Sequence, residues 1–169
     1  LYLNYLSGAN LILILGIIGV FLGFFYAAKP FRIVYGGFGE LAVGIGFGAL
    51  IILGTYYVQA RHLSLKALLI SLPIDILIAL VLFINEFPDY AADKSVGKKT
   101  LVVILGKNKA MVLYHILLAA TYLAILFLVF FKFLPLFCLI AMFTLPLALK
   151  SYIVSKKNFD KVYELLPAN

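Results

Sequence analysis

The chain has 169 residues, of which 65% are hydrophobic and 12% are charged, and its mean hydropathy is +1.13. A soluble domain is about half apolar and about a quarter charged, so this chain lacks the polar surface that a water-soluble globule needs. The same composition excludes a disordered chain. The net charge of +7 does not indicate nucleic-acid binding, because the cations lie between long apolar runs rather than on one polar face. The sequence therefore predicts a protein embedded in a lipid bilayer.

The cysteine content and the start of the chain add two expectations. Cys138 is the only cysteine, which excludes an intrachain disulfide and a metal site built from several thiolates. No signal-peptide pattern opens the sequence, and its first residue is Leu1 rather than methionine. We therefore expect further sequence upstream of Leu1.

Five apolar runs with almost no charged residues follow one another along the chain. They cover residues 11–28, 41–60, 67–84, 110–131 and 133–149. Each is about long enough to span a bilayer, the last one only just. The runs are continuously apolar rather than alternating, which argues against the strands of a membrane barrel. We expect an all-α, polytopic membrane helix bundle with five spanning helices.

Glycines recur four residues apart in the first two runs. Gly19 precedes Gly23, and Gly44 precedes Gly48, at this spacing. In membrane helices small residues at this spacing let two backbones approach closely. The glycine-rich stretch of residues 36–48 matches neither a dinucleotide-binding nor a P-loop pattern, so helix packing is the interpretation that we favour.

The basic residues fall unequally on the two sets of connections between these runs. One set carries eleven of them: Lys29, Arg32, Lys94, Lys98, Lys99, Lys107, Lys109, Lys150, Lys156, Lys157 and Lys161. The other set carries three: Arg61, Lys66 and Lys132. Because cytoplasmic loops are enriched in Lys and Arg, the first set is expected on the cytoplasmic side of the cell membrane.

The connection at residues 85–109 holds the most informative pattern, and its first part reads NEFPDYAADKSVGKKTLVVILG. Asn85, Asp89 and Asp93 are spaced by four, which places their side chains on one face of a helix. Oxygen ligands in such an arrangement suit Mg²⁺, with Asn85 as the weaker candidate. We expect Pro88 to end the third membrane helix and Asp89 to begin a short new one.

Three lysines follow these acids directly. Lys94, Lys98 and Lys99 could neutralise phosphate oxygens that a metal ion bridges to the carboxylates. The alternative is a solvated cytoplasmic loop in which the lysines only set the topology and the acids cap a helix. The spacing by itself leaves both interpretations open.

The whole string resembles the second aspartate-rich motif of the UbiA family of intramembrane prenyltransferases, DxxxDxxxGKxTLxVxLG. Every fixed position is matched, by Asp89, Asp93, Gly97, Lys98, Thr100, Leu101, Val103, Leu105 and Gly106. The preceding INEFPD and the following KNKA are most similar to the branch that prenylates 1,4-dihydroxy-2-naphthoate on the way to menaquinone. Residues 26–44 resemble that branch's loop between the fourth and fifth helices, and residues 160–169 resemble the connection before the last helix.

This resemblance implies a nine-helix fold with its active site at the cytoplasmic ends of the helices and an isoprenyl diphosphate bound through Mg²⁺. Asp89 and Asp93 would then be the catalytic, metal-holding acids. Nothing in residues 1–169 matches the family's first motif, NDxxDxxxD. We therefore expect one membrane domain that corresponds to the C-terminal half of the family without its final helix, and expect this half alone to be inactive.

The resemblance also implies which cations meet the diphosphate. Lys98 occupies the motif's lysine, and Lys94 is a second candidate. The family's YxxxK element is imperfect, because Lys29 lies three residues after Tyr26 rather than four. Arg32 stands where this branch usually has arginine, so we favour Arg32 over Lys29 and Tyr26.

Five other polar residues are weaker candidates for the functional site. Asp75 lies midway along the third run, where a charge is costly, and it either lines the cavity or pairs with a polar group on a neighbouring helix, which we favour. Glu40 begins the second run, where the helix dipole favours an acid, and Glu86 is expected on a polar rim. His62 is expected to be solvated, and His115 to pack rather than transfer protons.

Two classes of function remain ahead of a third, a purely structural membrane subunit, which the acids and lysines of residues 85–109 disfavour. The first is a Mg²⁺-dependent prenyltransferase acting on a quinone precursor, with a 4-hydroxybenzoate or glycerol-phosphate acceptor as the variant. The second is an ion-coupled transporter or channel that would use Asp75, Asp89 and Asp93 as ion sites. That class predicts a polar path across the bilayer, yet the runs at 41–60, 110–131 and 133–149 contain no acid. The sequence specifies neither the acceptor, the prenyl length nor an oligomeric state.

Overall fold

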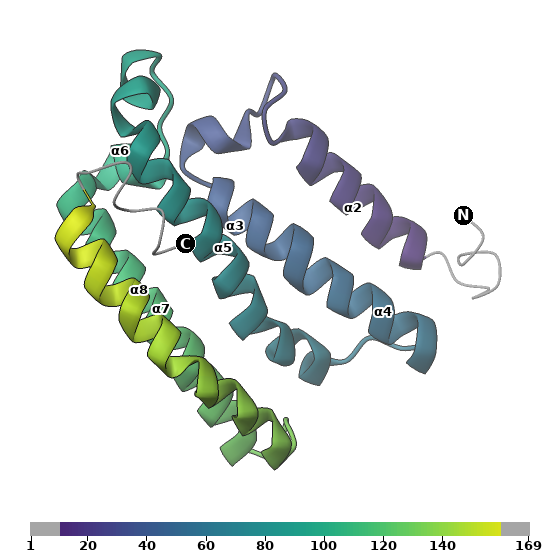
Figure 1. Ribbon diagram of the computed structural model, residues 1–169. Helices are drawn as coiled ribbons and strands as arrows, with labels where there is room; N and C mark the ends of the chain where they lie inside the picture. Colours follow the sequence, from purple (N-terminus) through teal and green to yellow (C-terminus); the bar gives the residue numbers. More distant parts are fainter. Residues whose placement is uncertain (1–10, 160–169) are drawn as a thin grey trace.

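The computed structural model describes residues 11–159, and every regular element among them is helical (Figure 1). In chain order these are α2 (Leu11–Phe25), the 3-10 turn η1 (Ile33–Gly36), α3 (Gly39–Gly44), the π-helical segment η2 (Ile45–Ala49), α4 (Leu50–Ala60), α5 (Leu65–Ser95), α6 (Leu101–Leu105), α7 (Lys107–Phe130), the 3-10 segment η3 (Leu136–Thr144) and α8 (Leu145–Asn158). The predicted all-α class is confirmed. The opening residues and the segment 160–169, which includes Lys161, lie outside the described residues.

Each of the five apolar runs forms helix. Four helical stretches are long and apolar enough to cross a bilayer: Gly39–Ala60 (α3, η2 and α4), Leu65–Ser95 (α5), Lys107–Phe130 (α7) and Leu136–Asn158 (η3 and α8). Helix α2 has 15 residues, or about 22 Å, against a hydrocarbon core of about 30 Å. The described chain is thus a polytopic membrane bundle of four long apolar helices and one shorter one.

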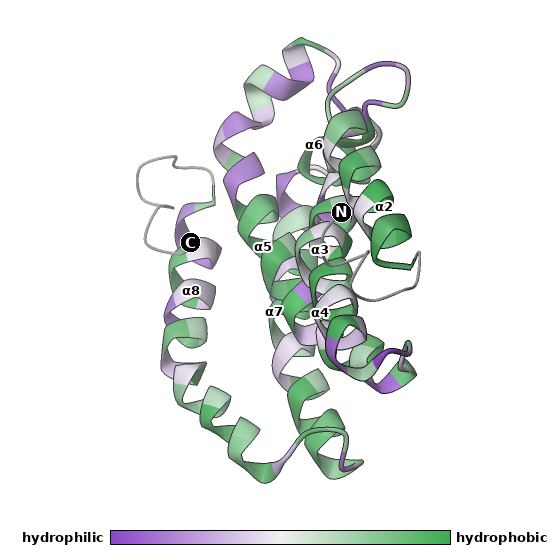
Figure 2. Ribbon diagram, turned by 90° about the vertical axis from the view of Figure 1, so that its right-hand side faces the viewer, coloured by the Kyte–Doolittle hydropathy of each residue, from purple (hydrophilic) through white to green (hydrophobic). Residues whose placement is uncertain are grey.

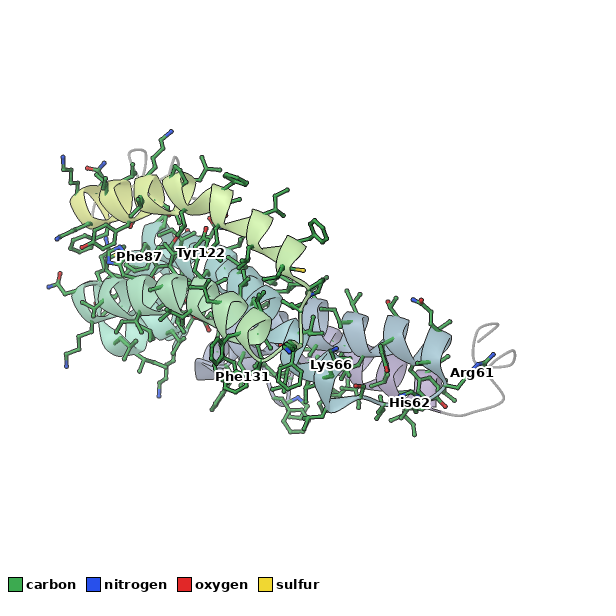
Figure 3. The ribbon with its side chains drawn as sticks, turned by 90° about the horizontal axis from the view of Figure 1, so that it is seen from below. Arg61, His62, Lys66, Phe87, Tyr122 and Phe131 are labelled. Carbon is green, nitrogen blue, oxygen red and sulfur yellow. The ribbon has the colours of Figure 1, made fainter. Side chains whose placement is uncertain are left out.

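The connections lie alternately at the two ends of this bundle (Figure 1). We call the end that carries residues 26–38, residues 96–106 and the C-terminus of α8 the motif end. Figure 2 shows hydrophilic residues gathered at the ends and apolar residues between them. Arg61 and His62 lie at the opposite end, at the tip of α4, on the other side of the view from Phe87 (Figure 3). Within residues 11–159, the two sets of basic connections predicted from the sequence therefore lie at different ends.

Helix α5 runs without interruption for 31 residues, so the predicted break at Pro88 is wrong. Proline has no N–H, which leaves the carbonyl of Ile84 without its helical partner, but packed membrane helices tolerate such a gap. Phe83, Ile84 and Phe87, in this part of the helix, are at most 2% exposed and belong to the core that α5 forms with α6 and α7. Packing of these side chains keeps the helix continuous through Pro88.

The predicted close approach of two helices is confirmed at Gly44 and Gly48. A Cβ atom at Gly44 would lie 2.8 Å from the carbonyl oxygen of Asp75 on α5, and one at Gly48 would overlap the Oδ1 atom of Asp75. The same interpretation is wrong for the other pair within residues 11–159. A Cβ atom at Gly23 would meet nothing within 4 Å, and one at Gly19 would have its nearest neighbour 3.9 Å away.

Candidate functional site at the motif end

The candidate site is built on the last turns of α5. Asn85, Asp89 and Asp93 lie on this one helix, and each step of four residues rotates by about 40°, so the three side chains follow one face. Asp93 is 8% exposed, whereas Asp89 is exposed and forms no ion pair within residues 11–159. The pair therefore offers one carboxylate that is held by the protein and one that is open to a ligand.

Gly97 ends α5 and turns the chain back onto Asp93. Its φ of +71° is left-handed, the conformation typical of the residue just after a helix. The N–H of Lys98 donates to the carbonyl of Asp93 at 2.9 Å, and that of Gly97 donates to the carbonyl of Lys94 at 3.3 Å. The Lys98 ammonium then reaches the Oδ2 atom of Asp93 at 3.0 Å. The spacing of aspartate, glycine and lysine in the motif thus follows from helix capping.

The segment after this cap packs against the connection between α2 and α3. The Lys99 N–H donates to the carbonyl of Tyr35 at 3.3 Å. A Cβ atom at Gly37, whose φ is +79°, would lie 3.3 Å from the Lys99 carbonyl oxygen and would overlap the side chain of Ile104. Thr100 begins α6, and its hydroxyl accepts from the backbone N–H three residues later at 3.4 Å. The two connections of the motif end therefore form one surface.

Lys29 and Arg32 lie on this surface and are both exposed. Arg32 has a left-handed φ of 44°, and its guanidinium carbon lies 5.1 Å from the centroid of the Tyr35 ring. Neither cation pairs with an aspartate in the described part of the chain. Both charges are therefore directed to the solvent side of the motif end, where an anion could meet them.

Tyr90 brings two further lysines together. The ammonium nitrogens of Lys94 and Lys107 lie 5.7 Å and 5.6 Å from the centroid of its ring, within the range of a cation–π contact. Lys94 thus contacts an aromatic ring rather than Asp89 or Asp93. Sequence reasoning missed Tyr90 and Lys107. The available signal was the spacing of four between Tyr90 and Lys94 on a helix.

Glu40 and Glu86 form a buried carboxyl pair between α3 and α5. Each is 5% exposed, so the expected place of Glu86 on a polar rim is wrong. The two groups interact with each other, and their four oxygens have no hydrogen-bond partner with good geometry within residues 11–159. Tyr26 lies beside them. Burial, and then the carboxylates of Glu86 and Glu40, raise the pKa of the Tyr26 phenol. Glu86 also interacts electrostatically with Lys98, which links this pair to the aspartate face.

Asp75 lies near the middle of α5, away from the motif end. The hydroxyl of Ser71, one turn earlier on the same helix, donates to its Oδ2 atom at 3.1 Å. The carboxyl group also lies against the backbone of Gly48 and Ala49 in η2. Its polar contacts therefore combine its own helix with the backbone of a neighbouring one.

The two histidines have separate structural surroundings. The Nε2 atom of His115 hydrogen-bonds the hydroxyl of Ser155 at 2.9 Å and so joins α7 to α8. His62 is exposed at the opposite end, where it hydrogen-bonds the hydroxyl of Tyr56 at 3.2 Å. Packing for His115 and solvent exposure for His62 are as expected from the sequence.

The donor chemistry of Asp89 and Asp93 fits one side of a site for a hard cation. Carboxylate oxygens are the ligands that Mg²⁺ prefers, and it usually takes only one or two from the protein when a phosphate supplies others. Within residues 11–159 no three Asp, Glu, His or Cys side chains converge on one point. The described part of the chain thus supplies two carboxylates beside a lysine.

The chain is similar in sequence to known proteins. The family model "UbiA prenyltransferase family" matches residues 2–165. Two of the similar proteins are 1,4-dihydroxy-2-naphthoate octaprenyltransferases. That of Bacillus subtilis is 33% identical over 64% of this chain and 35% of its own length. That of Mycobacterium tuberculosis is 36% identical over 73% and 41%.

A third relative is the 2-carboxy-1,4-naphthoquinone phytyltransferase of Synechocystis, which is 39% identical over 53% of this chain and 29% of its own length. The matched segments cover well under half of each of these relatives. No solved structure matches the chain. Because the family model covers nearly all of the sequence, the chain belongs to the UbiA prenyltransferase family.

Proposed function

We propose that this chain supplies the diphosphate-binding half of a membrane prenyltransferase. The complete protein would transfer an isoprenyl group from its diphosphate to an aromatic acceptor like 1,4-dihydroxy-2-naphthoate. The observation that carries the proposal is the Asp89–Asp93 face of α5 with Lys98 returned onto Asp93. The names of the relatives from Bacillus subtilis and Mycobacterium tuberculosis support this class of acceptor.

Asp89 and Asp93 are the residues that would hold Mg²⁺, with the side-chain oxygen of Asn85 as a weaker third ligand. When bound, the metal supplies positive charge to the diphosphate oxygens. Asp93 keeps the Lys98 ammonium 3.0 Å from one of its oxygens, so a cation of the protein already stands beside the carboxylates. The donor set therefore suits a diphosphate that is held by metal and lysine together.

The remaining cations would surround the leaving group. We assign Lys98 and Arg32 to the diphosphate first, and Lys94, Lys29 and the Tyr26 hydroxyl after them. The C–O bond of the donor breaks with its electron pair on the diphosphate, which neutralising charges make a better leaving group. A ring carbon of the acceptor then bonds to the allylic carbon, and the ring regains its aromaticity by losing a proton or, where that carbon carries the carboxylate, carbon dioxide. Apolar surroundings keep water from the allylic centre.

The same proposal gives the protein an orientation. We assign it to the cell membrane as a multi-pass protein with its motif end in the cytoplasm, because most basic residues lie in the connections of that end. Asp75 remains a weaker candidate for the wall of the substrate cavity, since acids within a membrane helix are usually functional.

A direct assay of the protein from the complete gene tests this proposal. With Mg²⁺, geranylgeranyl diphosphate and 1,4-dihydroxy-2-naphthoate, mass spectrometry should detect the prenylated ring. Asp89→Ala and Asp93→Ala should abolish it. Lys109→Ala is the matched control, because Lys109 is an exposed lysine of the same end with no assigned role.

The outcomes separate the alternatives. Turnover only with 4-hydroxybenzoate or a glycerol phosphate would overturn the acceptor and keep the reaction class. A wild-type protein that transfers no prenyl group to any of these acceptors would overturn the enzyme assignment. Full activity of the Asp89 and Asp93 variants would remove these residues from the site.

A further inference from the structure

An apolar groove of about 480 Å³ lies between α2 and the stretch formed by α3, η2 and α4. Figure 1 shows α2 running alongside this stretch, with the two joined at the motif end. The volume is within the range of small-molecule sites, about 300–1,000 Å³. Leu22 and Phe47 are among the side chains that line it, and Tyr26 is its polar residue. The groove thus pairs a hydrocarbon wall with one phenol.

Three glycines, Gly19, Gly23 and Gly46, line this groove. A Cβ atom at Gly23 or Gly46 would meet nothing within 4 Å, so these positions face open space rather than a packed neighbour. This differs from Gly44 and Gly48, where a Cβ atom would press on α5. The lack of side chains at Gly23 and Gly46 therefore widens the groove and does not serve helix contact among the described residues.

Tyr26 connects the groove to the cations of the motif end. Its carbonyl accepts the N–H of Val34 at 3.0 Å, which closes residues 27–33 into a loop directly after the groove. That loop carries Lys29 and Arg32, both exposed. A molecule with an apolar tail and an anionic head could therefore place its tail in the groove and its head beside Lys29 and Arg32.

We propose that this groove holds the isoprenyl chain of the diphosphate substrate, and that Gly23 and Gly46 set the length and width of chain that it admits. The proposal rests on the function proposed above and adds specificity-determining residues to it. Membrane lipid tails are as apolar as an isoprenyl chain, so hydrophobicity alone would not make the groove favour the isoprenyl chain over a lipid tail. Selection instead depends on shape, and the two glycines are the positions at which shape is most easily changed.

Gly23→Leu and Gly46→Leu in the full-length protein test the proposal. Each should lower kcat/KM for geranylgeranyl diphosphate about tenfold or more relative to geranyl diphosphate, since pockets discriminate single methylene groups by about 10–200-fold. Gly16→Leu is the matched control. Gly16 is exposed on the same helix, has no neighbour among residues 11–159 within 4 Å of its Cβ position and does not line the groove. The ratio of its kcat/KM values for the two diphosphates should equal that of the wild type.

A second measurement does not depend on the variants folding. A geranylgeranyl diphosphate with a diazirine at its far end should label wild-type residues 19–26 or 42–51 on irradiation, and unlabelled diphosphate should compete. Labelling elsewhere, or labelling that diphosphate does not displace, would overturn the proposal in favour of a membrane lipid or another helix in the groove. An equal loss of kcat/KM for geranyl and geranylgeranyl diphosphate in the Gly23→Leu and Gly46→Leu variants would also overturn the proposal. A wild type without prenyl transfer would instead overturn the proposed function.

Discussion

The backbone of Gly97 decides where the motif lysine lies. The left-handed φ of +71° reverses the chain after α5 and returns Lys98 to Asp93. Apart from the two adjacent residues, no atom of residues 11–159 lies within 4 Å of a Cβ built at Gly97, so the requirement for glycine is conformational and not steric. Substitutions here therefore report on the backbone alone.

Gly97→Ala should lower the free energy of unfolding by about 1 kcal/mol, because a side chain disfavours the left-handed region. It should also raise the KM for the diphosphate, since Lys98 would leave Asp93. Thermal unfolding in detergent and substrate titration measure the two effects. Gly54→Ala, at a helical position with equally open space, is the control: it should not lower the free energy of unfolding and should leave the KM unchanged.

The partly buried phenol of Tyr26 predicts that the stability of the protein falls at high pH. Burial raises the pKa of its phenol above the ordinary 10.0, so the folded state holds this proton more tightly than the unfolded one. The stability that this provides is fully present below about pH 10 and is lost as pH rises through the folded pKa. The unfolding temperature of the wild type relative to Tyr26→Phe should therefore be constant up to about pH 9 and fall by about pH 11. A relative loss that begins near neutral pH would contradict the burial of this phenol.

The spacing of residues along the chain predicted part of the site, whereas the part that depends on contacts between distant segments could not be predicted. The positions of Asp89 and Asp93 on one helix face follow from helical geometry alone. The burial of Glu40 and Glu86 depends on which face of α3 meets α5, and nothing local specifies that contact. Their spacing from other residues was compatible with a rim, a ligand or a buried pair.

The contact of η2 with α5 depends on single glycines. A Cβ atom at Gly48 would overlap Oδ1 of Asp75 and lie 3.1 Å from its Cα atom, so the neighbouring backbone cannot yield without separating the helices. Gly46, two residues earlier in the same π-helical segment, faces open space. The two positions make a matched pair.

Gly48→Ala should destabilise the protein by about 1–3 kcal/mol through overpacking, whereas Gly46→Ala should be neutral or slightly stabilising. Thermal unfolding of the substrate-free protein in detergent measures the difference. Equal unfolding temperatures for the two variants would contradict the close approach of η2 and α5.

The presence of each long helix followed from the apolar runs, but the ends of the helices and their internal irregularities did not. Continuous hydrophobicity identified the helices because a bilayer requires it. The predicted break at Pro88 was wrong because a proline need not end a helix whose neighbouring turns are held by packing. Here Phe83 and Phe87 pack into the core that α5 forms with α6 and α7. The π-helical turn η2 and the long 3-10 segment η3 carry no pattern that distinguishes them from α-helix.

At the scale of the whole molecule, the two ends of the bundle differ in charge, and this predicts a fixed orientation. Lys109 lies at the motif end and Arg61 at the opposite end. In a background in which Cys138, the only cysteine of residues 1–169, and any cysteine elsewhere in the complete protein are replaced by alanine, a membrane-impermeant maleimide added to intact cells should label Arg61→Cys. It should leave Lys109→Cys unlabelled until the cells are opened. The reverse pattern would contradict the cytoplasmic assignment of the motif end.

We propose that one turn of α5, capped by Gly97, binds a diphosphate through Mg²⁺ and Lys98. The most direct test is the affinity of the complete protein for a non-reactive thio-analogue of geranylgeranyl diphosphate, measured by calorimetry with and without Mg²⁺. The wild type should bind at least about tenfold more tightly with Mg²⁺, and Asp93→Asn should remove that dependence while Lys109→Gln keeps it. Binding that ignores both Mg²⁺ and Asp93→Asn would contradict the account.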